Sequence, residues 1–287
     1  MAPALVEPGQ TLGVIGTGVM GKAILEGLLN ANALTHDQAW GTSRSARTCE
    51  AVAARLGVPV ETDISQRLPT ASVLVLCVKP AQVAAALDTL RAAPGLRPDT
   101  LLISIVAGTT LHDLASQLGT PNPWVRAMPN TPCVVGEGMT AIAGGPDATV
   151  AQLTKARQVF ECVGLCVETE ERHFNAITAV SGSGPAYQYL IMEAMADAGV
   201  RVGLPRELAL TLVAQTALGA ARMVQVSGRH PAALRDDVTT PAGCTIGGLL
   251  MLEDGKIRSV LARAIEEAAH IVATLAPDTS VSGNPRG

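Results

Sequence analysis

A glycine-rich segment near the start of the chain carries the first chemical signal. The run GVIGTGVMG has the spacing G-x-G-x-x-G and lies between a strand-like apolar run and a helix-like segment. In such a loop the first glycine permits a tight turn, the second lets backbone approach a pyrophosphate, and the third lets helix and strand pack closely. The pattern predicts a dinucleotide site rather than a plain structural turn. The predicted contacts are Gly16, Thr17, Gly18, Val19, Met20 and Gly21.

The end of the second predicted strand indicates which dinucleotide binds. NAD sites usually carry Asp or Glu there to hold the ribose 2'-hydroxyl. This chain reads TSRSAR over residues 42–47, without an acid. Ser43 and Arg44, with help from Arg47, could hold a 2'-phosphate through charge-assisted hydrogen bonds. We therefore expect NADPH as the cofactor, with NADH also usable; a merely solvated Arg44 is the alternative.

Two further loops follow predicted strands and are expected to line the same cleft. CVKP supplies Cys77, Val78, Lys79 and Pro80, whose backbone could contact the nicotinamide ribose. Lys79 is either a ribose contact or a solvated lysine at a helix start. MPNTP is made rigid by two prolines, and its Asn130 and Thr131 could hydrogen-bond a carboxamide, unless the loop is simply a rigid turn.

Alternating short apolar runs and helical patterns must position these loops. Such alternation indicates βαβ units and a mostly parallel sheet, that is, an α/β Rossmann-type domain. The expected strands are 11–15, 39–43, 58–62, 72–78, 100–106, 124–128, 139–143 and 165–169. One expected helix begins near Val19. The others cover 46–57, 80–92, 110–118 and 147–162.

After Thr169 the strand pattern stops and helical patterns continue. They are interrupted at Ser181–Gly184, resume near Pro205 and Pro231, and end with a helix from about Lys256 to Leu275. The sequence thus predicts a nucleotide-binding domain over 1–169, an all-helical domain over 170–275 and a disordered tail over 276–287.

Composition excludes several classes of function. The net charge is -4, with four lysines and no basic stripe, so nucleic acid is not an expected partner. The six cysteines are scattered and the five histidines isolated, which indicates free thiols in a reducing cytoplasm and no metal site. We expect no apolar stretch of the ~18 residues that a membrane span requires, and no signal peptide.

Five motifs, in order, give the chain a family resemblance: GVIGTGVMGKAI, VLCVKPAQV, RAMPNTPCVVGEGMTAI, ITAVSGSGPAYQYLIMEAMADAGVRVGLPRELA and LRDDVTTPAGCTIGGLLMLEDG. Together they resemble the Δ1-pyrroline-5-carboxylate reductases over residues 10–275. The resemblance implies hydride transfer from NADPH or NADH to the C=N bond of 1-pyrroline-5-carboxylate, giving L-proline. It also implies a helical dimerisation domain, homodimers or rings of dimers, and an active site where one subunit's helical domain meets the nucleotide domain.

The loop TTPAGCTIGG then becomes the expected substrate site. A carboxylate can be held by hydroxyls and by backbone N–H groups at a helix N-terminus, and a helix is expected to start near Thr245. By resemblance, the Thr240 hydroxyl and the N–H groups of Cys244 and Thr245 hold the carboxylate, and the Thr245 hydroxyl faces the ring nitrogen as the catalytic group. Simple N-capping by Thr245 is the alternative. The predicted substrate contacts are Val238, Thr240, Pro241, Gly243, Cys244 and Thr245.

Departures from the family pattern concern two places. Ala242 stands where a glycine is usual, and we expect it not to need a positive φ. Asp63 stands where many relatives carry Asn, so it is left out of the site. The kinked SGSGPAY segment, Ser181–Tyr187, serves either packing or the wall of the site, and Tyr187 is expected in the core.

Two classes of function compete with this one: another reductase of the wider superfamily, and a non-catalytic nucleotide-binding protein. β-Hydroxyacid dehydrogenases share the glycine loop but use a lysine one turn into the helical domain, whereas this chain has no lysine from Glu170 to Asp254. A reductase of another cyclic imine stays open, because pocket shape sets ring size. A non-catalytic nucleotide sensor would not need Thr240, Gly243 and Thr245 in register.

Overall fold

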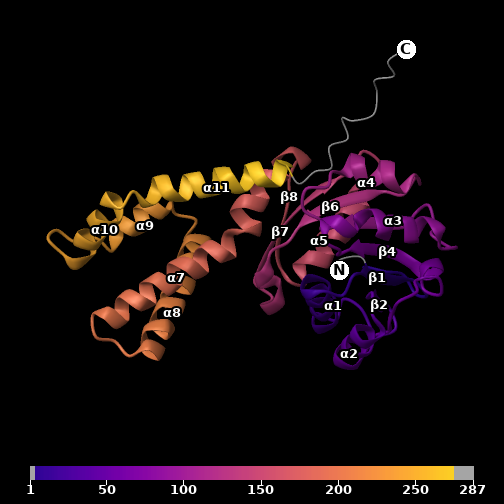
Figure 1. The fold of residues 1–287 in the computed structure, drawn as a ribbon, viewed down its shortest axis with the longest axis horizontal. Helices are drawn as coiled ribbons and strands as arrows, with labels where there is room; N and C mark the ends of the chain where they lie inside the picture. The colour runs from indigo at the N-terminus through magenta and orange to yellow at the C-terminus, as the bar shows by residue number, and fades with distance from the viewer. Residues whose placement is uncertain (1–3, 275–287) are drawn as a thin grey trace, which may run out of the picture. The chain divides into compact units, whose positions relative to one another are not determined.

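The computed structural model describes residues 4–274 and divides them into two compact units. The first unit takes the chain up to Gly182 and the end of the last helix from Ala268; the second takes Ser183–Glu267. Strands and helices alternate in the first unit, whereas the second is helical (Figure 1). The predicted fold class is therefore confirmed. The predicted tail, 276–287, lies outside the described residues.

Eight strands make up the sheet of the first unit. They are β1 (Thr11–Ile15), β2 (Ala39–Thr42), β3 (Val60–Glu61), β4 (Ala71–Leu76), β5 (Leu101–Ser104), β6 (Trp124–Met128), β7 (Gly138–Gly144) and β8 (Gly164–Glu168). Their spatial order is β3-β2-β1-β4-β5-β6-β7-β8. Neighbours are parallel except β6 and β7, which are antiparallel. The order of the first six strands is that of dinucleotide-binding folds, whose ligands bind where the order reverses, beside β1.

The helices of this unit connect the strands and cover the sheet. They are α1 (Val19–Asn30), α2 (Ala46–Leu56), α3 (Val83–Ala92), α4 (Leu111–Leu118), α5 (Val150–Glu161) and α6 (Phe174–Ile177). Short turns are η1 (Leu68–Thr70), η2 (Pro80–Gln82), η3 (Thr131–Val135) and η4 (Glu171–His173), and η5 (Thr178–Gly182) is π-helical. Gly57 ends α2 with a φ of 67°, the left-handed cap that glycine adopts without steric cost.

Side chains on the two faces of the sheet form separate cores. In β4, Val73 and Val75 pack in one cluster with α1 and α5, whereas Leu74 and Leu76 pack in another with α3 and α4. This alternation follows from the two-residue period of a strand. Both faces are thus covered, as the near-continuous apolar run of β4 predicts for a central parallel strand.

Some element boundaries differ from those predicted. The third strand has two residues instead of the expected 58–62. The helix expected over 147–162 begins at Val150, because the Thr149 hydroxyl accepts from the Gln152 N–H and caps it. The helix expected over 80–92 begins as a 3-10 turn at Pro80, and only Val83–Ala92 is α-helical.

The second unit contains α7 (Gly184–Arg201), α8 (Arg206–Ser227), α9 (Pro231–Asp237), α10 (Cys244–Asp254) and most of α11 (Ile257–Thr274). Its long helices bury little within the chain: α7 buries only Ala196 and α8 only Ala209. Tyr187, expected in the core, is half-buried.

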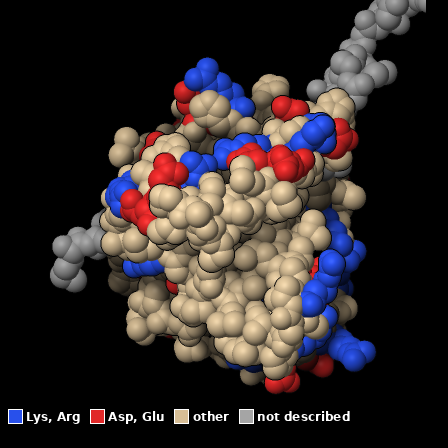
Figure 2. Space-filling model, turned by 90° about the vertical axis from the view of Figure 1, so that its left-hand side faces the viewer, with Lys and Arg blue, Asp and Glu red and all other residues tan. Residues whose placement is uncertain are grey.

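Large apolar side chains are exposed instead, among them Leu190 (65%), Leu218 (60%) and Val226 (72%). The face shown in Figure 2 accordingly has a broad uncharged area with basic and acidic side chains around it. So much exposed apolar surface indicates an interface with another chain.

One expectation about apolar stretches is wrong. By length and composition alone, α8 could cross a membrane: it has 22 residues and a mean hydropathy of 1.2 over its most apolar window. Only 6% of that window is buried within the chain. The same apolarity is expected of a helix that packs against a second protein chain.

A buried ion pair fastens the segment after β8 to the sheet. Arg126 in β6 is 3% exposed, and its Nη1 lies 3.0 Å from Oε1 of Glu171 in η4. The same carboxylate accepts the Leu111 N–H at the start of α4 (2.7 Å), and the Arg126 guanidinium lies over the Phe174 ring, 4.7 Å from its centroid. One carboxylate therefore compensates a buried charge and caps a helix.

We predict that Glu171→Ala lowers the free energy of unfolding by about 3 kcal/mol, because it leaves a buried guanidinium without its counter-charge. Urea unfolding at fixed protomer concentration measures this loss. Glu170→Ala is the matched control: its pair with Arg172 is exposed, so its effect should stay below about 0.5 kcal/mol. Equal effects of the two substitutions would show that Glu171 does not act through the buried pair.

Candidate active site

The three glycines of the loop after β1 have three different structural reasons. Gly16 has a φ of 102°, and a Cβ there would lie 2.7 Å from the Cys77 carbonyl oxygen of the neighbouring strand end. A Cβ on Gly21 would collide with the Gly16 carbonyl. Among the described residues, a Cβ on Gly18 would meet nothing within 4 Å, so none of their contacts requires glycine there. Open space at this position is what a backbone approaching a pyrophosphate needs.

Thr42, at the end of β2, holds the glycine loop in place. Its carbonyl accepts the Thr17 N–H (2.8 Å) and hydroxyl (3.2 Å), and its own hydroxyl accepts the Gly16 N–H (3.2 Å). Thr17 is only 3% exposed, and both its N–H and its hydroxyl are used to hold the glycine loop against β2. Thr42 was not among the residues predicted from the sequence, although a hydroxyl that ends an apolar strand was a usable signal.

The first turn of α1 keeps its donors available. The N–H groups of Gly18, Val19, Met20 and Gly21 have no acceptor among the described residues. The cap residue Gly18 offers no side-chain acceptor either. These groups can therefore bind an anion, helped by the positive end of the helix dipole.

The loops after β2 and β4 carry the other predicted nucleotide contacts. Ser43 is half-buried and Arg44 exposed after β2, and neither Arg44 nor Arg47 has a carboxylate partner among the described residues. This uncompensated positive charge fits a ribose 2'-phosphate. Cys77 and Val78 pack against Gly16, whereas Lys79 and Pro80 are exposed. Burial raises the pKa of the Cys77 thiol, which disfavours its thiolate form.

Asn130 is already bonded at both ends of its amide. Its Oδ1 accepts the Met139 N–H of β7 (2.8 Å), and its Nδ2 donates to the Ser181 carbonyl of η5 (3.2 Å). The side chain thus ties the MPNTP loop to β7 and to the kinked SGSGP segment. Thr131 is exposed at the start of η3, and its hydroxyl makes no hydrogen bond with the described residues, so it could contact a ligand.

The second unit holds the predicted carboxylate site at the start of α10. Gly243 is the cap residue of that helix, and a Cβ on it would collide with the Thr240 hydroxyl. Its own N–H donates to the Thr240 carbonyl (3.0 Å), which closes the turn. The next three N–H groups, of Cys244, Thr245 and Ile246, have no acceptor among the described residues. Val238 and Pro241 are exposed beside them.

Thr245 is not the cap of α10. It is the second residue of the helix, so the capping role that could have explained a threonine here belongs to Gly243. Within the described part of the chain, the hydroxyls of Thr240 and Thr245 make no hydrogen bond. Two hydroxyls and three N–H groups are therefore available within the seven residues 240–246.

Ala242 corrects one expectation. Its φ is 58°, in the left-handed region, although we expected this residue to need no positive φ. The turn that brings Thr240 against Gly243 requires that conformation. The usual glycine of the family would adopt it without strain, whereas alanine does so at a cost of about 1 kcal/mol.

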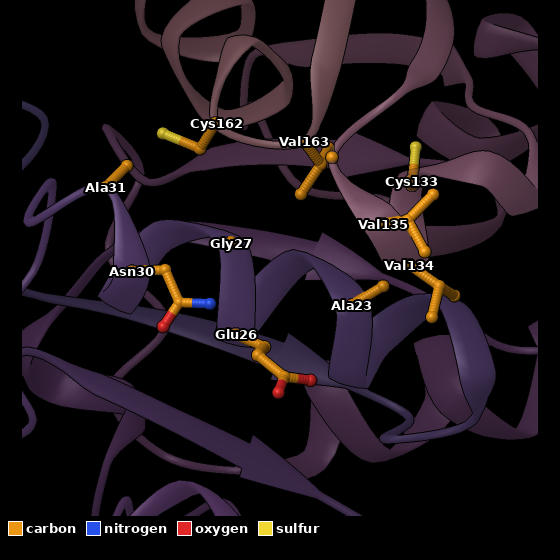
Figure 3. Close-up of a pocket in the computed structure, with 11 residues that line it drawn as sticks. Ala23, Glu26, Gly27, Asn30, Ala31, Cys133, Val134, Val135, Cys162 and Val163 are labelled. Carbon is orange, nitrogen blue, oxygen red and sulfur yellow. The ribbon is translucent and has the colours of Figure 1, made fainter. Parts of the chain in front are cut away.

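Other kinds of site find no support in residues 4–274. All six cysteines are free thiols, and no group of three or more His, Cys, Asp or Glu side chains could hold a metal ion there. A cavity of about 470 Å³ lies along α1, between η3 and the turn at Cys162 and Val163 (Figure 3). None of the predicted site residues lines it, so this cavity is not the candidate site.

Comparisons with known proteins decide the family. A family model described as pyrroline-5-carboxylate reductase dimerisation matches residues 171–275, and one described as NADP oxidoreductase, coenzyme F420-dependent, matches residues 11–108. The pyrroline-5-carboxylate reductase of Pisum sativum is 39% identical over 92% of this chain and 96% of its own. The chain belongs to the pyrroline-5-carboxylate reductase family. The resemblance read from the five motifs is therefore confirmed.

Solved structures of pyrroline-5-carboxylate reductases agree with this membership. The Coxiella burnetii protein matches with a TM-score of 0.85 and 34% identity, over 93% of this chain and 99% of that one. The Plasmodium falciparum protein, solved with NADP bound, matches with a TM-score of 0.83 and 30% identity, over 93% and 98% of the two chains. This chain thus shares the family's fold over nearly its whole length.

We predict opposite effects for alanine at two glycines of the loop. Gly18→Ala should leave the thermal midpoint unchanged, because the new methyl group meets no protein atom, but should weaken NADPH binding about tenfold by crowding the phosphate. Gly21→Ala should lower the thermal midpoint by several degrees, because the methyl group collides with the Gly16 carbonyl. Calorimetric titration and thermal melting measure the two effects. Normal NADPH binding by Gly18→Ala would contradict the predicted pyrophosphate contact.

Proposed function

We propose that this chain reduces the C=N bond of 1-pyrroline-5-carboxylate to give L-proline, the last step of proline biosynthesis. The observation that carries the proposal is the N-terminus of α10, where free N–H groups and two free hydroxyls stand together without an acidic or basic side chain. Such a site suits a small anionic substrate that needs little acid or base catalysis, because a protonated imine is already electrophilic. Family membership supports the same reaction.

The cofactor is NADPH, which supplies the hydride when bound; NADH is also usable. The first turn of α1 would hold the pyrophosphate, and Ser43 and Arg44 would hold the 2'-phosphate. The backbone of Cys77–Pro80 would contact the nicotinamide ribose. Asn130 and Thr131 would lie at the carboxamide; since the Asn130 amide is occupied, Thr131 is the freer donor.

The substrate loop acts by binding and orientation. Thr240 and the N–H groups of Cys244 and Thr245 would grip the carboxylate, while Val238, Pro241 and Gly243 shape the wall. The Thr245 hydroxyl would face the ring nitrogen, orient it and relay a proton. Holding two reactants in a productive geometry can lower a barrier by roughly 7–11 kcal/mol, so strong acid catalysis is not required.

Assembly completes the site in this proposal. The chain self-associates through its dimerisation domain, and the exposed apolar residues of α7 and α8 supply the surface for it. We propose that a homodimer, or a ring of dimers, forms the active site where one subunit's helical domain meets a nucleotide domain. We further propose a cytoplasmic enzyme without nucleic-acid or membrane partners. The domain boundary between residues 169 and 170 stays a prediction. It lies next to the start of the family match for the dimerisation domain, which covers residues 171–275.

Oxidation of a β-hydroxyacid, or reduction of its keto form, is disfavoured by the lysine content. That chemistry would use a lysine early in the helical domain, and Lys155 and Lys256 stand on either side of it. A related cyclic imine would fit the same donors, since they recognise only the carboxylate and the ring nitrogen.

A direct assay tests the proposal. Purified protein is mixed with NADPH and pyrroline-5-carboxylate, and the absorbance of the reduced nicotinamide is followed. We expect it to fall with formation of proline. Activity on a six-membered cyclic imine acid, with none on the five-membered one, would reassign the substrate. Inactivity on both would refute the reductase.

We predict that Thr245→Ala lowers kcat/KM for pyrroline-5-carboxylate about 10- to 100-fold, as expected for loss of a hydrogen bond to a charged group. Thr245→Ser should keep most of the activity because it keeps the hydroxyl. Thr239→Ala is the control, since its hydroxyl already donates to the Arg235 carbonyl (2.8 Å). If Thr245→Ala had the kinetics of this control, the hydroxyl would have no part in the reaction.

We predict that Arg44→Ala raises KM for NADPH about tenfold or more, while KM for NADH changes little, because only NADPH carries the 2'-phosphate. Steady-state kinetics with each cofactor at saturating imine measure both constants. Equal changes for the two cofactors would remove Arg44 from the 2'-phosphate site.

A further inference from the structure

The first unit leaves only two of its described arginines without a carboxylate partner, and both follow β2. They are Arg44 and Arg47. The others each lie within 4 Å of Asp or Glu: Arg55, Arg67, Arg91, Arg97, Arg126, Arg157 and Arg172. The positive charge at this corner is therefore not neutralised, although arginine–carboxylate pairing is the rule in the rest of the unit.

Arg44 has a neutral partner instead. With the Gln82 amide oriented so that its oxygen faces the guanidinium, Oε1 lies 2.8 Å from Nη1 and 3.3 Å from Nη2 of Arg44. In the opposite orientation the amide NH₂ would face the guanidinium donors, and the oxygen would gain only the Lys79 N–H at 3.4 Å. Since a guanidinium can only donate, the first orientation is the better one.

The positions of the two residues in the sheet give this contact its meaning. Arg44 follows β2, and Gln82 ends the η2 turn that follows β4. Between these two strands lies β1, whose carboxyl end carries the glycine loop. The Arg44–Gln82 contact therefore spans the carboxyl edge of the sheet beside the point where the strand order reverses, where dinucleotides bind in such folds.

We propose that Gln82 is a positioning residue that holds the Arg44 guanidinium for the 2'-phosphate and so strengthens the preference for NADPH over NADH. The inference rests on the proposed cofactor site. An exposed arginine samples many rotamers, and a partner that fixes one of them before binding reduces the entropy lost on binding. An amide does this without cancelling the charge, whereas a carboxylate would pair with Arg44 and repel the phosphate.

Two probes that differ only in the 2'-phosphate test the proposal: adenosine 2',5'-bisphosphate and 5'-AMP, titrated calorimetrically into the whole chain. Gln82→Leu should weaken binding of the bisphosphate about threefold to tenfold, the range for one hydrogen bond, and leave 5'-AMP unchanged. Gln82→Glu should weaken the bisphosphate further. Gln117→Leu, a half-buried glutamine on α4 whose side chain makes no hydrogen bond with the described residues, is the control and should bind both probes normally.

The double variant Arg44→Ala/Gln82→Leu separates positioning from direct contact. If Gln82 acts through Arg44, the second substitution has no further effect in the Arg44→Ala background. If Gln82→Leu weakened bisphosphate binding as much in the Arg44→Ala background as in the original protein, Gln82 would contact the phosphate directly. If Gln82→Leu weakened binding of both probes equally, its effect on the crevice would be general. Either result overturns the proposal. Reduction of pyrroline-5-carboxylate is assayed separately, so an inactive protein that still shows the probe selectivity would refute the enzyme function and leave this inference standing.

Discussion

The first N–H groups of an α-helix have no acceptor within the helix, and this chain treats that constraint in two ways. The helices α2, α4 and α5 are capped by hydroxyls, of Ser45, Thr110 and Thr149. The helices α1 and α10 have glycine as the cap residue, without a side-chain acceptor. The two helices with glycine as the cap residue are those assigned to the pyrophosphate and to the substrate carboxylate. A capping hydroxyl or carboxylate would place an oxygen where each anion is expected to bind.

Anion binding by main-chain N–H groups also explains why the substrate loop contains no acidic or basic side chain. Anion binding by main chain needs small residues that let the ligand approach, and it needs a turn of fixed shape. Gly243 is the small residue that lets the ligand approach, and Ala242, with its positive φ, helps to fix the shape of the turn. Because neither half of the site carries a strong acid or base, the protein has to contribute by placing two bound molecules. The exposed apolar helices matter for this reason, because self-association through them is the proposed means of bringing the nucleotide site and the substrate loop together.

Local rules predicted much of the fold. Glycine positions, apolar runs and the alternation of strand and helix patterns predicted the sheet and the loop after β1. Features set by tertiary contacts were not predictable: the conformation of Ala242, the two hydrogen bonds that occupy Asn130, and the partner of Arg44 in a loop far along the chain. Thr245 is an intermediate case, because a threonine near a helix start predicts capping, and only the position of Gly243 shows that it does not cap. The candidate site residues were predicted from motifs, whereas their availability for a ligand had to come from the structure.

Glu171 belongs by sequence to the helical half, yet its carboxylate accepts from α4 and compensates Arg126 inside the sheet. The nucleotide-binding half is therefore electrostatically complete only when the chain continues past its last strand. During synthesis, β6 and the start of α4 emerge from the ribosome long before this acid. Until it arrives, any sheet formed around β6 would hold the Arg126 guanidinium without its carboxylate partner.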